Sequence, residues 1–413
     1  MTPETIAQLK RRAQDEIDAV ASLLIETSDW MADNPELGYQ EVRASERLTA
    51  LLEEFGARVD RGIADLPTAF SAELWPGDES GPQVAIVAEY DALPDVGHGC
   101  GHNIIATAAI GAGIALARIG AQLPGGARVI GTPAEESAVP NAGGKVPILD
   151  HGYFDGVDAA IMIHPMTEDS IAGGSSLVAY GLEFEFFGRA AHAAANPHEG
   201  VNALDACIAF FTAVGLLRQQ TRPDARIHGI ITYGGGAPNV IPPYTSCRFR
   251  VRARDAAYAK QLMQRVIACA AGAATATGAR MEWREYAHPY LNMVPNASVG
   301  AALRANLTAL GRDVHDERDG DGSGSTDFGN VSHRVPAAYA YLGICGREAG
   351  WHTKEVADAT RTPRGHAAIL AGAKSLAMTA IDLLADPSLR QRTHDEHAAA
   401  MVPVRAALAS LES

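Results

Sequence analysis

The sequence predicts an α/β fold in which a mixed β-sheet is flanked by helices and carries an inserted ferredoxin-like (βαββαβ) domain. Three observations lead to this prediction. Short β-branched runs alternate with longer helical patterns along much of the chain, which is typical of α/β proteins. A central stretch changes to the period-two alternation of half-exposed strands. With 413 residues the chain also exceeds the size of a single-core domain, which favours two domains.

The larger domain is predicted from short apolar runs and longer helical patterns. Strands are expected at residues 84–88, 127–131, 157–163 and 337–342. Helices are expected at residues 45–55, 104–119 and 367–384. The first thirty residues form one amphipathic helical pattern, which is unlike a signal peptide. Its apolar side carries Ile17, Val20, Leu23 and Leu24.

The inserted domain is predicted from the order of its elements. Strands are expected at 182–186, 226–233, 245–253 and 280–286, and helices at 202–219 and 256–277. This β-α-β-β-α-β order is that of the ferredoxin-like split unit. In the third strand, Cys247, Phe249 and Val251 face one way, and Arg248, Arg250 and Arg252 face the other. We expect residues 178–290 to form the inserted domain, and residues 1–177 and 291–413 to form the larger one.

The composition argues against several classes of partner and environment. The formal net charge is −15 and no Lys/Arg cluster with interleaved aromatic residues occurs, so no nucleic acid is expected as a partner. No apolar stretch reaches the roughly 18 residues of a membrane span, since the best candidate, 104–117, is short and rich in glycine and alanine. The five cysteines are scattered and odd in number, unlike a secreted disulfide framework, which favours a reducing cytoplasm.

Cys100 and His102 form the first pair of candidate metal ligands. They are two positions apart, so they diverge on a helix but can converge at a strand end or a tight turn. The flanking Gly99 and Gly101 permit backbone geometry that other residues resist. One alternative is a buried free cysteine beside a polar histidine. Another is a nucleophilic pair with an activated thiolate, which leaves the carboxylates described next without a role.

Two adjacent carboxylates, Glu135 and Glu136, form the second candidate. They follow a predicted strand and Pro133, which places them on a loop where successive side chains diverge. One of them can therefore bind a metal while the other faces the attacking water. A carboxylate close to another in a partly dry pocket has a raised pKa, which suits a general base. The alternative is a solvated acidic loop, which the apolar neighbours make less favourable.

Two histidines complete the candidate set. His164 ends the apolar run 159–163, and His352 lies between a tryptophan and a threonine. Each of them alone is as typical of a structural histidine as of a ligand. Together the four segments supply one thiolate, three imidazoles and two carboxylates, which is enough to bind two divalent cations. They lie at or just past predicted strand ends, where open α/β sheets bind ligands.

Six motifs, taken in order, resemble those of a known family. They are Glu89-Tyr90-Asp91-Ala92-Leu93-Pro94, Gly99-Cys100-Gly101-His102, Pro133-Ala134-Glu135-Glu136, Gly188-Arg189-Ala190-Ala191-His192-Ala193-Ala194, Asn239-Val240-Ile241-Pro242 and Trp351-His352-Thr353. In this order they resemble the aminoacylase/carboxypeptidase G family of dinuclear metallopeptidases. The similarity is closest to its amidohydrolase branch, which includes hippurate hydrolase, auxin-conjugate hydrolases, aminobenzoyl-glutamate hydrolase and a β-alanyl-lysine dipeptidase.

The resemblance implies a role for each matching residue. The implied ligands of two divalent ions per subunit are Cys100, His102, Glu136, His164 and His352. Glu135 would be the general base and acid. Asp91 would not bind the metal itself but would orient one of its ligands. His192 would be a lid histidine that reaches the partner subunit's active site and polarises the scissile carbonyl, and Asn239 would bind substrate on the same lid. The inserted domain would then be a lid that forms a homodimer, with a tetramer left open.

Two positions depart from the family pattern. Asn103 stands where relatives often carry aspartate, and Glu89 stands where they carry aspartate or histidine. Both could alter metal preference, and neither removes a ligand. The thiolate favours zinc, while carboxylates and imidazoles also suit manganese, cobalt or nickel.

We therefore expect a cytoplasmic metal-dependent amidohydrolase that cleaves the amide bond of small N-acyl- or N-aminoacyl-amino acids, or of similar small amides. One alternative is a deaminase or other C–N hydrolase that uses the same site on a non-peptide substrate. Another is a catalytically inactive metal-binding or regulatory protein on the same scaffold. A substrate carboxylate would need an arginine, and Arg189, Arg222 and Arg334 are candidates that the sequence alone does not place.

Overall fold

The chain folds into two compact units. A computed structural model describes residues 1–78, 80–317 and 324–409. The first unit contains Met1–Ser175, a segment that begins at Met293, and Asp327–Val402. The second unit contains Ser176–Asn292, Gly324–Thr326 and the chain from Pro403 onward.

The second unit takes in more of the chain than the sequence indicated. Gly324–Thr326 and the chain from Pro403 were both expected in the larger domain, but they belong to the second unit. The backbone N–H of Leu177 donates to the carbonyl of Gly324, and Leu408 packs against the core of this unit. Such contacts join residues far apart in the chain, so no local pattern could reveal them.

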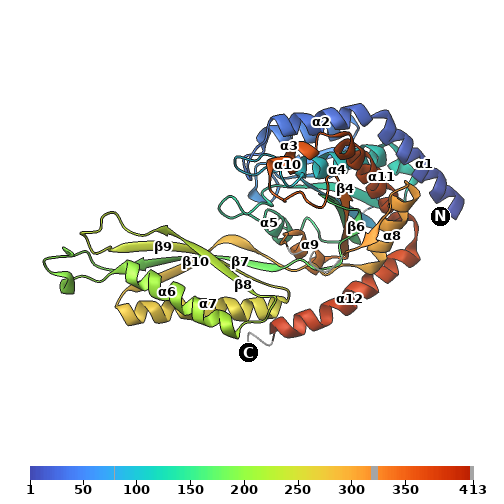
Figure 1. The fold of residues 1–413 in the computed structure, drawn as a ribbon. Coiled ribbons are helices and arrows are strands. Elements are labelled where there is room, and N and C mark those ends of the chain that lie inside the picture. The colour runs from blue at the N-terminus through green and yellow to red at the C-terminus, as the bar shows by residue number, and fades with distance from the viewer. Residues whose placement is uncertain (79, 318–323, 410–413) are drawn as a thin grey trace. The chain divides into compact units, whose positions relative to one another are not determined.

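A mixed sheet forms the centre of the first unit (Figure 1). Its eight strands have the order β1-β2-β4-β3-β5-β12-β6-β11. β3 is parallel to both β4 and β5, β12 is parallel to β5, and β11 is parallel to β6. β1 pairs with β2, β2 with β4 and β6 with β12 in antiparallel fashion. The mixed sheet agrees with the sequence prediction, and each expected strand overlaps an observed one. The strands are β1 (Arg58–Arg61), β2 (Phe70–Glu73), β3 (Gln83–Glu89), β4 (Gly126–Thr132), β5 (Ala159–Met166), β6 (Ser170–Ile171), β11 (His315–Asp316) and β12 (Ala337–Gly343).

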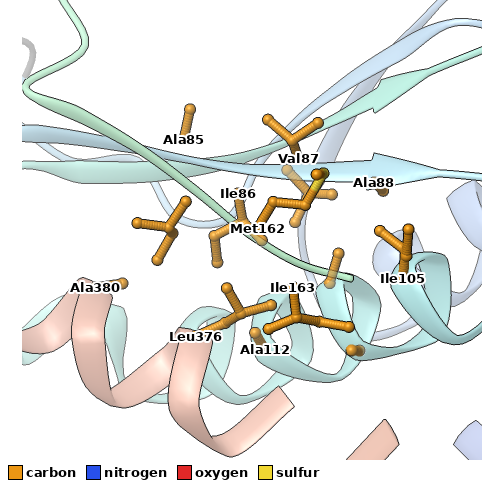
Figure 2. Close-up of a cluster of buried hydrophobic side chains, with 14 of the residues drawn as sticks. Ala85, Ile86, Val87, Ala88, Ile105, Ala112, Met162, Ile163, Leu376 and Ala380 are labelled. Carbon is orange, nitrogen blue, oxygen red and sulfur yellow. The ribbon is translucent and has the colours of Figure 1, made fainter. Parts of the chain in front are cut away.

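Helices flank this sheet. They are α1 (Pro3–Ala19), α2 (Ala21–Asp33), α3 (Val42–Glu54), α4 (His102–Ile119), α5 (Lys145–Asp150), α8 (Ala297–Ala309), α9 (Phe328–Arg334), α10 (Lys354–Ala359) and α11 (Pro363–Ala385), with short 3₁₀ turns η1 (Ile63–Asp65) and η2 (Gly120–Gln122). α12 (Pro387–Ala409) begins in the first unit, and its residues from Pro403 belong to the second. α4 and α11 pack against each other and against the central strands, and α1 packs against both. Figure 2 shows the resulting core, in which Ile86 and Ile163 of the sheet meet Ala112 and Leu376 of the two helices.

The N-terminal helical pattern is two helices rather than the single helix that we expected. α1 ends at Ala19 and α2 begins at Ala21, with Val20 between them in a non-helical conformation. Ile17 and Leu24 are fully buried, as predicted, whereas Val20 and Leu23 are only half-buried. The break lets each helix turn its own apolar stripe toward the core.

Two helices of the first unit are long and apolar enough to cross a membrane by length and composition alone. They are His102–Gln122 and Pro363–Ala385. The first is longer than the apolar segment 104–117 of the sequence, because the 3₁₀ turn η2 extends it. Most of the apolar window of each is buried inside the unit, 83% and 72% respectively, as in the core helices of a soluble protein. That the protein has no membrane partner stays a prediction.

The second unit has the element order that its sequence pattern predicts. Its four-stranded antiparallel sheet has the order β10-β7-β9-β8, and α6 and α7 lie along one face (Figure 1). The rings of Phe184, Phe210 and Phe249 meet between the sheet and the helices. The elements are β7 (Val178–Phe187), η3 (Pro197–Glu199), α6 (Ala203–Leu217), η4 (Arg218–Gln220), β8 (Arg226–Tyr233), β9 (Tyr244–Ala253), α7 (Ala256–Thr277) and β10 (Arg280–Tyr290).

The other face of this sheet is less exposed than the predicted half-exposed strand. Glu183 of β7 and Arg250 of β9 are each only 7% exposed. Glu183 forms ion pairs with Arg248 and Arg284, so charged side chains cover one another on this face. Alternation in the sequence indicated which residues share the face, but not how densely their side chains would pack.

Candidate functional site

The ends of the parallel strands of the first unit bring the candidate residues together. Asp91 follows β3, Glu135 and Glu136 follow β4, and His164 lies near the end of β5. The strand register pairs Glu89 with Thr132, so β3 and β4 end side by side. Because parallel strands present their carboxyl ends at one edge of a sheet, residues from separate motifs meet there.

Cys100 and His102 reach the same edge through a tight turn. His102 is the first residue of α4, and Gly101 before it has a φ of 79°. A Cβ atom on Gly101 would lie 2.7 Å from Cγ of Pro165, so both the conformation and the close approach require glycine. The turn brings Sγ of Cys100 to 3.5 Å from Nε2 of His164. The convergence that the sequence left conditional therefore occurs.

His352 joins the same cluster from a loop in the last part of the first unit. It lies just before α10 and has a φ of 63°, which is rare for a residue with a side chain. Its backbone N–H donates to the carbonyl of Gly99, and its Nε2 lies 3.4 Å from Oε1 of Glu136. The loop is thereby tied to the turn that carries Cys100.

Three overlapping groups of side chains could each hold a metal ion. In each group the ligand atoms lie within 4.8 Å of one another. The groups are Cys100, His102 and His164; Cys100, Glu136 and His352; and His102, Glu135 and Glu136. All five ligands expected from the sequence belong to this cluster. Because the groups share members, the arrangement suits two neighbouring cations.

Hydrogen bonds orient two of the imidazoles for metal binding. Nδ1 of His102 donates to Oδ1 of Asp91 at 2.9 Å, and Nδ1 of His164 donates to the backbone carbonyl of Pro165 at 2.6 Å. Each bond leaves Nε2 as the nitrogen that can bind a cation, which is the usual carboxylate- or carbonyl-supported arrangement of metal-binding histidine. Burial lowers the pKa of His164 to about 4, so this imidazole is neutral and can act as a ligand.

Two buried polar atoms at the centre of the cluster are placed to bind a cation. Nε2 of His102 and Oε1 of Glu136 are inaccessible to solvent, and neither makes a hydrogen bond with a residue in the described part of the chain. An unsatisfied buried polar atom costs about 1–3 kcal/mol, and more when it is charged. A thiol, imidazoles and carboxylates at this separation are the donor set that zinc and related divalent metals use.

Glu135 has the environment of a general base. It is 8% exposed, and Oε2 lies 3.9 Å from Nε2 of His102. Burial, together with the neighbouring Glu89 and Glu136 carboxylates, raises the pKa of Glu135 well above its usual value. A carboxyl group of this kind can accept a proton near neutral pH and return it.

A buried ion cluster that sequence reasoning missed adjoins the site. Nζ of Lys145, a fully buried residue, lies 2.5 Å from Oδ1 of Asp327 and 2.7 Å from Oε1 of Glu89, the latter as an ion pair rather than an aligned hydrogen bond. The other oxygen of Glu89 lies 3.5 Å from Nε2 of His102. The signal in the sequence was a single lysine in the apolar run 143–149.

Glu89 and Asn103, the two departures from the family pattern, have different surroundings. Glu89 faces the candidate ligands on one side and Lys145 on the other. Nδ2 of Asn103 donates to Oγ of Ser28 at 3.0 Å, which ties α4 to α2. Glu89 can therefore influence the metal site, whereas the described contact of Asn103 is with the helix layer.

His192 and Asn239 lie on neighbouring loops of the second unit. Their loops are joined by a bridge between His192 and Val240 and by a hydrogen bond from Ala193 N–H to the carbonyl of Asn239. Nδ1 of His192 accepts from the backbone N–H groups of Ala194 and Ala195, at 3.2 Å each. Nδ1 is therefore the unprotonated nitrogen, and Nε2 of this exposed imidazole carries a proton that it can donate.

The three arginines that the sequence suggested for a substrate carboxylate are engaged elsewhere. Arg189 donates to the carbonyl of Glu199, Arg222 stacks over Tyr258, and Arg334 lies 3.6 Å from Asp155. Each of these three guanidinium groups therefore already has a partner in the described structure.

Arg250 of β9 is a stronger candidate, which the sequence pattern placed on a strand but did not single out. Nε donates to the hydroxyl of Tyr286, while Nη1 and Nη2 are buried and bond to no residue among those described. Arg252 lies two residues further along the same face. Its Nε is also buried and bonds to no described residue, while its Nη1 donates to Oγ of Ser325 at 3.4 Å. The face thus holds two guanidinium groups with donors to spare, which suits a carboxylate ligand.

Comparisons with known proteins agree with this site. The model of peptidase family M20/M25/M40 matches residues 85–380. Xaa-Arg dipeptidase of Mus musculus is 39% identical over 401 residues, covering 94% of this chain and 92% of the relative. A p-aminobenzoyl-glutamate hydrolase chain from Escherichia coli is 29% identical, covering 94% and 95%. The crystal structure of an aminobenzoyl-glutamate utilization protein from Klebsiella pneumoniae has a TM-score of 0.73 at 21% identity, covers 89% of this chain and 97% of its own, and shows the same fold.

Proposed function

Because this chain belongs to peptidase family M20/M25/M40, we propose that it is a metal-dependent amidohydrolase that cleaves the amide bond of small N-acyl- or N-aminoacyl-amino acids. The observation that carries this proposal is the convergence of Cys100, His102, Glu136, His164 and His352 beside Glu135. Five potential ligands and a carboxylate with a raised pKa at one sheet edge are the parts of a hydrolytic metal site.

The five ligands would hold two divalent cations. A bound cation of this kind polarises a carbonyl group and lowers the pKa of water. The Cys100 thiolate favours zinc, and manganese, cobalt or nickel are the alternatives that the imidazoles and carboxylates permit. Burial and the Glu136 carboxylate raise the pKa of the Cys100 thiol above its usual range, so the protein alone does not stabilise a free thiolate there. This environment is unfavourable for a cysteine nucleophile.

Residues of the chain would carry out proton transfer, orient the metal ligands and polarise the scissile carbonyl. Glu135 takes a proton from the attacking water and delivers it to the leaving amine. Asp91 holds His102 through Nδ1 and the backbone N–H of Glu136 through its other oxygen, which fixes two ligands at once. His192, whose Nε2 carries a proton, is the donor that we assign to the oxygen of the scissile carbonyl, and Asn239 is its neighbour on the substrate-binding side.

A free carboxylate on the substrate is a further part of the proposal. A dipeptide ending in arginine and an aminobenzoyl-glutamate, which the names of the two relatives specify, both carry one. Arg250 and Arg252 offer unsatisfied donors for such a group in the second unit. We therefore expect amino-acid conjugates with a free carboxylate to be preferred over the corresponding amides.

The test is a substrate panel run with defined metal content. N-acetyl, N-benzoyl, β-alanyl and aminobenzoyl conjugates, together with Xaa-Arg dipeptides, are assayed with zinc and with manganese, before and after chelation. We expect hydrolysis of at least one class, loss of activity on chelation and recovery when metal is added back. Activity that survives chelation and is abolished by alkylating Cys100 would instead indicate a cysteine hydrolase.

The same panel distinguishes a deaminase and an inactive scaffold from the proposed enzyme. Release of ammonia from a non-peptide substrate, without cleavage of any conjugate, would point to a deaminase or other C–N hydrolase. Metal binding without turnover of any compound would point to an inactive scaffold. A homodimer formed through the second unit and a cytoplasmic location also remain proposals, which light scattering and fractionation can test.

A further inference from the structure

The segment 36–41 packs closely against the loop that carries the proposed base. We call residues 36–41 the brace and residues 133–144 the base loop. A Cβ atom on Gly38 of the brace would lie 2.8 Å from Cβ and 2.9 Å from Cα of Ala134. The hydroxyl of Tyr39 donates to the carbonyl of Asn141 at 2.5 Å. The brace therefore touches the base loop near both of its ends.

Glu41, the last residue of the brace, has a fully buried carboxyl group. Oε1 accepts from the backbone N–H of Ala134 at 2.9 Å, and Oε2 accepts from the hydroxyl of Thr68 at 2.9 Å. Both oxygens are thus held by uncharged donors. Burial, with a smaller effect from Asp91, raises the pKa of Glu41 to about 8. Burying a carboxyl group lowers the free energy of unfolding, so a side chain kept there at that cost points to a functional role for its contacts.

Stabilisation of the adjacent helix does not account for this side chain. Glu41 precedes α3, but its side chain makes no capping hydrogen bond. Glu36 has that task instead, since Oε2 accepts from the backbone N–H of Ala44 and Oε1 lies 3.0 Å from Nε of Arg43. The chain therefore uses the half-buried Glu36 for the helix and directs the buried Glu41 to the base loop.

The carboxyl groups of Glu41 and Asp91 accept hydrogen bonds from the backbone on either side of Glu135. Ala134 N–H donates to Glu41, and Glu136 N–H donates to Oδ2 of Asp91 at 2.9 Å. Ala134 has a φ of 55°, a left-handed conformation that costs about 1–3 kcal/mol unless its surroundings hold it. The hydrogen bond to Glu41 is one of the contacts that hold it, and the direction in which Glu135 leaves the backbone follows from that conformation.

We propose that Glu41 is a positioning residue, which acts through the backbone N–H of Ala134 to aim the Glu135 carboxylate at the reaction centre. This inference rests on the proposed role of Glu135 as the base. It assigns no contact between Glu41 and substrate or metal. Its consequence is that loss of the Ala134 hydrogen bond lowers turnover without emptying the metal site, because the ligands are fixed by other contacts.

The test compares three variants of the metal-loaded full-length protein. Glu41→Met keeps the size of the side chain and removes both acceptors. Thr68→Val is the matched control, because it removes the other hydrogen bond of Glu41 and leaves the one to Ala134 in place. Glu41→Gln retains an oxygen that can accept from Ala134. The measurements are kcat, KM, metal content per chain and hydrogen exchange of the base loop.

We expect kcat of Glu41→Met to fall by about 100-fold, the usual cost of misplacing a catalytic group by about 1 Å, with KM and metal content unchanged. Glu41→Gln should recover most of that loss, and Thr68→Val should lose far less than Glu41→Met although it also disturbs the buried site. Hydrogen exchange in the base loop should rise in Glu41→Met and not in Thr68→Val. An equal loss in Glu41→Met and Thr68→Val, or a loss of metal from Glu41→Met, overturns the proposal.

Two further measurements keep the proposal testable if the wild-type protein is inactive or if Glu41→Met does not fold. If the wild-type protein hydrolyses no amide, the proposed function fails, but hydrogen exchange still decides whether Glu41 holds the base loop. If Glu41→Met does not fold, Gly38→Ala displaces Ala134 from the same side, because its new Cβ meets Ala134 at 2.8 Å. Gly38→Ala should then lower kcat with metal retained, and wild-type kcat in that variant overturns the proposal.

Discussion

The two units contain unsatisfied polar groups of opposite kind. In the first unit, Nε2 of His102 and Oε1 of Glu136 are buried acceptors that make no hydrogen bond in the described structure. In the second unit, the corresponding buried atoms are the donors Nη1 and Nη2 of Arg250 and Nε of Arg252, together with the hydroxyl oxygen of Thr245. Because unsatisfied buried groups are destabilising, each set is best understood through the ligand that would complete it.

The difference indicates which kind of ligand each unit, taken by itself, could bind. The first unit needs cations, which fits a metal centre made of a thiol, imidazoles and carboxylates. The second unit has donors that suit an anion, such as the substrate carboxylate proposed above. Four substitutions test this contrast, from the largest expected effect to the smallest.

Replacing the proposed base should have the largest effect. Glu135→Gln keeps the size and a hydrogen-bonding side chain but cannot accept the proton from water. We expect kcat to fall by about 10²- to 10⁴-fold, the usual contribution of general base catalysis, with metal content unchanged. Steady-state kinetics and elemental analysis of the same sample check this, and near-normal turnover with full metal occupancy would remove Glu135 from the mechanism.

Removing the buried lysine should destabilise the first unit strongly. Lys145→Met leaves Asp327 and Glu89 without their shared cation in a fully buried place. Breaking a buried ion pair in this way typically costs about 3–5 kcal/mol. Denaturant unfolding of the metal-free protein should show the loss. A triple variant with Glu89→Gln, Lys145→Met and Asp327→Asn should regain much of it, because no charge then remains uncompensated.

Changing the anion-binding face should affect substrates selectively. Arg250→Met removes the unsatisfied donors and keeps much of the apolar bulk. For a conjugate with a free carboxylate we expect KM to rise by roughly 10- to 100-fold, which corresponds to the loss of a hydrogen bond to a charged group. A substrate with an amidated carboxyl group is the control, since its KM should change little. Equal effects on both substrates would contradict an anion-binding role.

An exposed ion pair should matter least. Nη1 of Arg361 lies 2.6 Å from Oδ1 of Asp33, with side-chain exposures of 44% and 57%. Solvent and salt screen such a pair, so Arg361→Ala should lower the free energy of unfolding by no more than about 1 kcal/mol. Measured beside Lys145→Met, it separates the effect of burial from the effect of charge. A loss as large as that of Lys145→Met would show that ion-pair geometry matters more than burial here.

Sequence patterns identified the candidate functional residues of the first unit more completely than those of the second. In the first unit, Cys100, Glu136 and His164 stood out because chemically distinctive residues interrupt apolar runs at strand ends. In the second unit, Arg250 was correctly placed on one face of a strand, but three arginines in alternation gave no reason to prefer it. The rings of Tyr286 and Tyr290 lie against its guanidinium group from β10, a strand distant in the chain.

Lys145 and Glu41 also have roles that could not be predicted from the sequence. Lys145 stands out in the sequence only as a single lysine in an apolar run, and Glu41 has an ordinary sequence context. The role of each becomes clear only through a partner 182 or 93 residues away, Asp327 or Ala134 respectively. The single N-terminal helical pattern likewise became two helices, because packing of each stripe on the core favoured a break at Val20.

The sequence by itself determined the alternation of strands and helices, the order of elements in the inserted unit and the residues able to bind metal, because these follow from side-chain periodicity and ligand chemistry. Tertiary structure alone decided which atoms are left without partners and which buried charges support the site. Those properties depend on distances and burial between remote segments, and the free energy of a polar group changes by several kcal/mol with those quantities.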